Sequence, residues 1–178
     1  MNGKSKDILE KAGWYEGRKI DLTDILEVYN KYNVEVFPKA KEFLEQFGDL
    51  EIDYSFCPNH SFNVKKLFKN SYREGWASEI SIVLDEKVLR IGGCGDYCVY
   101  ISESGKIYSD YGLIGNDMFD FWDLILETIP LKEVLERMST WEELGLVEQL
   151  YDAEQKLLAE DSEGDKGIEI VNYFSGLS

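Results

Sequence analysis

The sequence is poor in the residue types that most catalytic and metal sites use. It has a single histidine, His60, and three cysteines, Cys57, Cys94 and Cys98. The odd cysteine count without a CxxC pair favours neither a disulfide framework nor a zinc knuckle, and the spacings fit no familiar zinc finger. Because Cys-Pro-Asn-His-Ser is typical of a loop, we interpret His60 as a surface residue rather than a catalytic base.

Long apolar runs and positive charge are also scarce. No apolar run of about 18 residues is present, and the N-terminus does not resemble a secretion signal, so we expect a soluble cytoplasmic protein. Only 19 Lys and Arg oppose 35 Asp and Glu among 178 residues, giving a net charge of −16. Such a field repels nucleic acid and anionic membranes, and neither is an expected partner.

The negative charge is unevenly distributed along the chain. Residues 61–100 hold 6 basic and 5 acidic side chains, whereas residues 141–178 hold 2 basic and 10 acidic ones. Half of the net charge therefore lies in the last 38 residues. The acidity is a regional property.

Apolar spacing predicts helices at both ends of the chain and strands between them. Helices are expected at 7–12, 22–29, 38–47, 64–68, 116–129 and 131–138, with a last one from Trp141 to about Leu158 behind a capping box at 139–143. Asn116 is expected to cap its helix. Strands are expected at 50–56, 80–84, 88–91, 97–101 and 106–109, with a tight hairpin turn at Ser104–Gly105.

This order predicts an α+β fold. We expect N-terminal helices, a central, mainly antiparallel sheet of about 4 to 6 strands, and C-terminal helices packing on the sheet. The expected division is an α+β domain over residues 1–130 and an acidic, mostly helical extension over 131–178 packed on the same domain.

Two stretches of sequence resemble a known family. The segment from Ala12 to Asp21 contains Gly13-Trp14 followed by Gly17-Arg18, and a helix ending Phe-Leu-Glu-Gln-Phe-Gly-Asp-Leu follows. Together with the 101–108 hairpin, they resemble immunity proteins of the SUKH superfamily, particularly the SUKH-3 group, from about residue 7 to residue 130.

The resemblance implies a SUKH-like fold and a non-enzymatic role as a bacterial immunity protein, or antitoxin. Such proteins bind and neutralise toxins, often nucleases, of contact-dependent or polymorphic toxin systems, without a cofactor. The acidic segment after Pro130 and the extra Gly and Cys in 92–96 depart from the family pattern. An alternative is a non-enzymatic regulatory or scaffold module that binds a cellular protein.

The residues of the family motif are expected to be structural. We expect Gly13, Trp14, Gly17 and Arg18 to form a turn that locks the first helix on the sheet, with Trp14 buried and Arg18 paired to a carboxylate. The Gly-rich 92–96 stretch lacks the spacing of a phosphate loop, and we interpret it as a turn or bulge of the sheet. No paired nucleophile and base can be placed, which argues against an enzyme.

Acidic side chains supply the candidate binding residues. A concentrated acidic face can mimic nucleic-acid charge against a basic toxin domain, although it can also serve solubility alone. Asp117, Asp120 and Asp123 share a helix face whose spacing does not supply the loop oxygens of a calcium site. The predicted contacts to the toxin domain are Glu142, Glu143, Glu148 and Asp152, joined by Asp117 and Asp120.

Overall fold

The computed structural model describes residues 1–54, 57–68, 75–94, 97–126 and 128–163. Three helices come first, α1 (Gly3–Lys11), α2 (Thr23–Lys31) and α3 (Pro38–Phe47). Their amphipathic spacing and the proline in the first turn of α3 predicted them. Gly13, which ends the first helical stretch, has φ of 98°, a conformation open to glycine.

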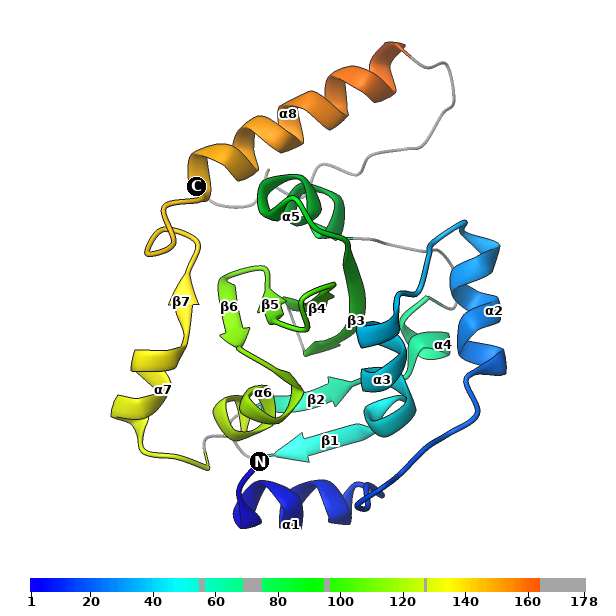
Figure 1. Cartoon of the computed structure of the whole chain (residues 1–178), viewed down its shortest axis with the longest axis vertical. Helices are drawn as coiled ribbons and strands as arrows, with labels where there is room; N and C mark the ends of the chain where they lie inside the picture. The colour runs from blue at the N-terminus through cyan, green and yellow to red at the C-terminus, as the bar shows by residue number, and fades with distance from the viewer. Residues whose placement is uncertain (55–56, 69–74, 95–96, 127, 164–178) are drawn as a thin grey trace.

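A meandering antiparallel sheet forms the centre of the molecule (Figure 1). Its strands are β1 (Glu51–Tyr54), β2 (Cys57–Ser61), β3 (Val88–Cys94), β4 (Tyr97–Ser102), β5 (Ile107–Ser109), β6 (Gly112–Gly115) and β7 (Ser139–Thr140). Each strand pairs with the next along the chain, so the sheet order is the chain order. The predicted turn at Ser104–Gly105 joins β4 to β5, with Gly105 at φ of 89°.

Helices cover both faces of this sheet. The remaining ones are α4 (Val64–Leu67), α5 (Ala77–Leu84), α6 (Met118–Ile125), α7 (Leu131–Arg137) and α8 (Val147–Glu163). The helix α3 contacts β3 and β4, α6 contacts β6, and α5 contacts both β3 and α8. In Figure 1, α8 and α5 lie at one end of the molecule and α1 at the other.

Alternation along β4 divides the interior into two cores. Val99 and Ile101 belong to the larger core, together with aromatic residues of α3 and α6, including Phe43, Phe47 and Trp122. Tyr100, which points to the opposite face, belongs to a smaller core that contains Ile80, Trp141 and Leu150. The smaller core thus joins the sheet to α5 and to the segment after α7.

The α+β fold class is confirmed, and the sheet has one strand more than the largest number expected. Three strands were not predicted: β2, which forms where a loop was expected at 57–61, β6 and β7. The last of them, β7, pairs with β6 through Gly112 and Thr140. A Cβ atom at Gly112, whose φ is 139°, would lie 2.1 Å from the Ser139 carbonyl oxygen. The close approach of β7 therefore requires glycine at position 112.

The expected strand at 80–84 is wrong, because these residues lie in α5. A short apolar run does not distinguish a strand from a buried helix by periodicity. The helix ends at Asp85, which adopts a left-handed conformation with φ of 52°, and the Ser81 hydroxyl donates to the Glu86 carbonyl oxygen at 2.6 Å.

Two predicted helix starts are also wrong. Asp117, not Asn116, caps α6: its Oδ1 accepts from the backbone N–H groups of Phe119 and Asp120, each at 2.8 Å. The capping box forms, since the Thr140 N–H donates to Glu143 and the Glu143 N–H donates to the Thr140 hydroxyl. It closes a turn over 141–145, and α8 begins only at Val147.

Candidate partner-binding surface

The Trp14 side chain holds the segment after α1 on the larger core. It is 4% exposed, and its ring stacks on Phe47 of α3 at 6.1 Å between centroids. Its indole Nε1 is buried and has no hydrogen-bond partner in the structure. The contacts of Trp14 are therefore internal and predominantly apolar, as a structural role requires.

The Arg18 guanidinium binds the C-terminal end of α3. Nη1 donates to the Gln46 carbonyl oxygen at 2.7 Å, and Nη2 donates to the Gly48 carbonyl oxygen at 2.9 Å. The expected carboxylate partner is thus replaced by backbone carbonyls, which the last turn of a helix leaves unsatisfied. Burial lowers the pKa of Arg18, and the nearby Asp49 carboxylate opposes this shift.

Asp117 and Asp120, two of the predicted binding residues, make contacts within the fold. Asp117 is exposed but its carboxylate caps α6. Asp120 accepts from the Asn116 N–H at 2.9 Å and from Arg137 at 2.9 Å. Burial raises the pKa of Asp120, but hydrogen bonds from Asn116 and the contact with Arg137 outweigh it, so the pKa is lowered overall.

Asp123, the third aspartate of this series, is buried. Its Oδ1 accepts from the Asn2 N–H at 2.9 Å and from the Ser5 hydroxyl at 2.5 Å. Asp123 therefore lies in the interior, although it shares a helix face with Asp117 and Asp120, and it ties α6 to α1. No group of His, Cys, Asp and Glu able to hold a metal ion occurs within the described ranges.

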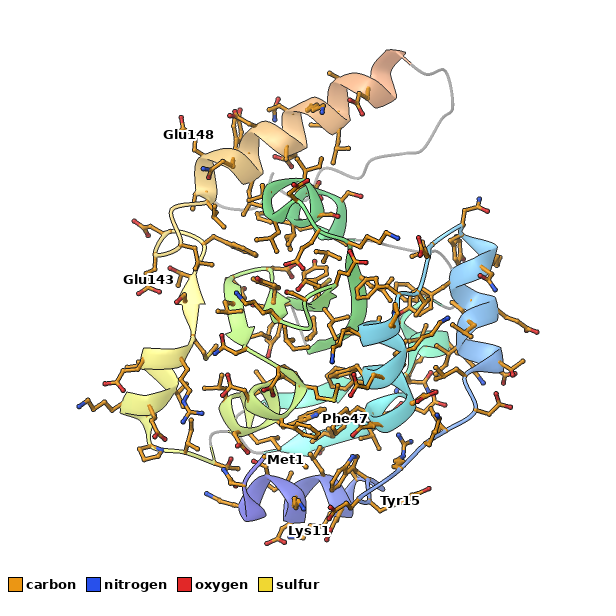
Figure 2. All side chains as sticks on the ribbon, viewed as in Figure 1. Met1, Lys11, Tyr15, Phe47, Glu143 and Glu148 are labelled. Carbon is orange, nitrogen blue, oxygen red and sulfur yellow. The ribbon has the colours of Figure 1, made fainter. Side chains whose placement is uncertain are left out.

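The other four predicted binding residues, Glu142, Glu143, Glu148 and Asp152, form what we call the acidic surface. All four are exposed. Figure 2 shows Glu143 and Glu148 on the outside of the molecule, beside β7 and at the start of α8. None of the ion pairs within the described part of the chain involves them, and Glu143 alone has a fixed role, in the capping box. Their charge is directed to solvent.

A buried hydrogen-bond network lies behind this surface. The Tyr100 hydroxyl donates to Asp110 Oδ1 at 2.5 Å and accepts from the Trp76 N–H at 3.0 Å. Asp110 Oδ2 accepts from the Cys98 N–H at 2.7 Å, and the Asp110 carbonyl oxygen accepts from the Trp141 indole. Burial raises the pKa of the Tyr100 hydroxyl, which stays protonated. The network connects β4, α5 and the turn before α8.

Comparison with known protein families identifies the chain. A family model described as SUKH-3 immunity protein matches residues 1–128. The chain belongs to the SUKH-3 immunity protein family. Membership supports an immunity role and implies binding to a cognate toxin, and the family is generally non-catalytic. No curated protein and no solved structure gives a significant match.

The match separates two parts of this SUKH-3 chain. The Trp14 and Arg18 contacts and β1 to β6 lie within the matched residues, whereas α7, β7 and α8 follow residue 128. All four residues of the acidic surface lie after the matched segment. Among the described helices, none is both long and apolar enough to cross a membrane.

The sequence interpretation missed a cavity between α5 and α8, lined partly by Trp76, Asp110 and Trp141. These residues come from three elements that are far apart in the sequence, so no local pattern brings them together. A signal was present in α8, where Val147, Leu150 and Tyr151 follow the three-and-four spacing of a helix face.

Proposed function

We propose that this SUKH-3 protein is a cytoplasmic immunity protein that neutralises the basic nuclease domain of its cognate toxin by stoichiometric binding, without catalysis or a cofactor. The observation that carries the proposal is the acidic surface, which is exposed and lies outside the family-matched residues. A nuclease holds phosphates with basic side chains, so a group of exposed carboxylates can occupy the same site.

Electrostatics favours this surface over the rest of the molecule. The segment 141–178 has ten acidic and two basic residues, which attract a cationic domain before contact. Complementary charge of this kind raises association rates by about 10- to 1,000-fold at low salt. Asp117 and Asp120 add to the field, but their carboxylates already bind groups of the protein itself and are the lesser contributors.

Co-expression with the toxin tests the proposal. The C-terminal domain encoded by the gene immediately upstream is expressed in a bacterium, with and without the protein, and growth is followed. We expect the wild-type protein to restore growth and to form a one-to-one complex by size-exclusion chromatography with light scattering.

A pair of matched variants shows whether the acidic surface is responsible. Glu148→Lys with Asp152→Lys is expected to reduce protection, whereas Asp7→Lys with Glu10→Lys, the same charge change on exposed residues of α1, keeps it. Growth arrest that wild-type protein does not relieve, with no complex formed, contradicts the proposed function and favours the scaffold alternative.

A further inference from the structure

The cavity between α5 and α8 is a feature that the charge argument does not use. Its volume is about 290 Å³. Its lining consists of aromatic and aliphatic side chains with three carboxylates among them: Trp76, Glu79, Asp110, Trp141, Val147, Leu150, Tyr151 and Glu154. Because small-molecule sites occupy about 300–1,000 Å³, this cavity suits a single side chain rather than a larger ligand.

The fold holds the base of the cavity rigidly. Trp141 is 5% exposed, stacks on Tyr108 at 5.5 Å with an interplanar angle of 7°, and donates its indole N–H to the Asp110 carbonyl oxygen at 3.1 Å. Leu150 is 4% exposed. A Cβ atom at Gly75 would lie 2.4 Å from the Tyr100 hydroxyl, so position 75 must be glycine for that hydroxyl to reach the Trp76 N–H.

The rim of the cavity is open and apolar. Val147 and Tyr151, one turn apart on α8, are 53% and 60% exposed. Leu150 and Glu154 continue the same stripe at the three-and-four spacing, and Leu150 is buried against α5 and the smaller core. A group entering from solvent therefore passes two exposed apolar side chains before it reaches the indole of Trp141.

The charge within the cavity has one sign. Its three carboxylates come from α5, the turn after β5 and α8, and none of the lining residues that the structure describes is basic. The Asp110 oxygens accept from Tyr100 and Cys98, which fixes the position of that charge. No ion pair in the described part of the chain includes Asp110 or Glu154. An apolar occupant would remove the Glu154 carboxylate from water without giving it a partner, whereas a cation pairs with it.

We propose that this cavity receives an arginine side chain of the cognate toxin, an inference that rests on the proposed function and names one anchor of the interface. A guanidinium is planar, stacks on aromatic rings and is more weakly hydrated than an ammonium, so it suits aromatic walls with carboxylates at their edge. Buried arginines that fill pockets are frequent centres of binding energy in interfaces. The acidic surface attracts the toxin, and the cavity fixes its register.

A small-molecule probe tests the cavity without the toxin. Acetylated arginine amide is titrated into the full chain, with acetylated citrulline amide, which has a similar shape and no charge, as the matched control. The indole N–H signals of the four tryptophans are followed by ¹H–¹⁵N NMR. We expect saturable shifts at Trp76 and Trp141 with arginine only, because Trp14 and Trp122 lie in the larger core. Equal shifts with both probes, or shifts at all four indoles, overturn the proposal.

A second experiment measures the dissociation rate of the complex with the toxin domain. Glu154→Gln, in the cavity, is compared with Glu160→Gln, an equal charge change on an exposed residue of the same helix, outside both the lining and the acidic surface. We expect Glu154→Gln to dissociate from the toxin domain about tenfold faster than wild type, and Glu160→Gln within about twofold. If the wild-type complex forms and the two variants dissociate alike, the cavity proposal is wrong while the proposed function stands. If no complex forms, the proposed function fails first.

Discussion

Three polar residues of the family-matched part differ in their contacts from three residues of the acidic surface. Within the matched part, Arg18, Asp120 and Asp123 each bind other groups of the same chain. In the extension, Glu142, Glu148 and Asp152 direct their charge to solvent and form no ion pair within the described residues. This contrast supports the proposal that the Trp14 and Arg18 motif maintains the fold, while the acidic surface after it serves recognition.

The largest expected effect is a loss of stability on replacing Trp14, in the family-matched part. Trp14→Ala removes the stack on Phe47 and leaves a void, and we expect the free energy of unfolding to fall by about 3–5 kcal/mol in urea denaturation. Trp14→Phe is the control: because the indole nitrogen has no partner, replacing it with Phe loses only contact area. A small loss with Trp14→Ala would contradict a structural role for the motif.

Arg18→Met is expected to cost about 2 kcal/mol, because two carbonyl oxygens at the end of α3 lose a charged donor. The neighbouring Lys19→Met is the control, since Lys19 is exposed and makes only a surface ion pair with Glu45. Toxin affinity of the folded Arg18→Met protein should be unchanged. If Arg18→Met weakens toxin binding without lowering the free energy of unfolding, Arg18 contacts the toxin, and the contrast between the two regions is wrong.

The Glu148→Lys, Asp152→Lys pair is expected to change binding rather than stability. Reversing two charges on the acidic surface should slow association with the toxin domain about tenfold at low salt in stopped-flow measurements, and should reduce its salt dependence. Asp7→Lys with Glu10→Lys, which alters net charge equally, should slow association much less. Equal slowing by both pairs would show that only net charge matters.

The smallest expected effect is the loss of stability on replacing Asp120. Its pKa is lowered in the folded state, so its contribution to stability is complete above the unfolded value of about 3.9 and disappears as pH falls through the lower folded pKa. Asp120→Asn should therefore cost less than about 1 kcal/mol at pH 7, and the difference from wild type should shrink below about pH 4. Asp117→Asn, which retains a capping side chain, should be near neutral. A difference independent of pH would contradict this account.

Sequence patterns predicted the fold class because amphipathic spacing and strand alternation are local. The N-terminal helices and the 104–105 hairpin turn follow from neighbouring residues, whereas the burial of Trp14 was expected from the family motif. The wrong secondary-structure predictions lie where tertiary contacts determine the local structure. The run at 80–84 is helical because it covers the sheet beneath α8, and β7 exists because Gly112 lets the chain approach.

The candidate site was only partly predictable for the same reason. Charge counting located the acidic surface, whose members lie close together in the sequence. The Asp110 network and the cavity depend on contacts between β4, α5 and the turn before α8, which no spacing rule connects. The predictions that fell on residues 164–178 and on the side chain of His60 lie outside the described residues.

Hydrogen exchange of the complex tests the central claim most directly. Amide exchange of the full chain is measured by mass spectrometry with and without the upstream gene's toxin domain. We predict slower exchange on binding in α5, the 141–145 turn and α8, with α1 and α2 unchanged. Protection confined to α1 and α2, with α8 unaffected, would contradict the assignment of recognition to the C-terminal extension.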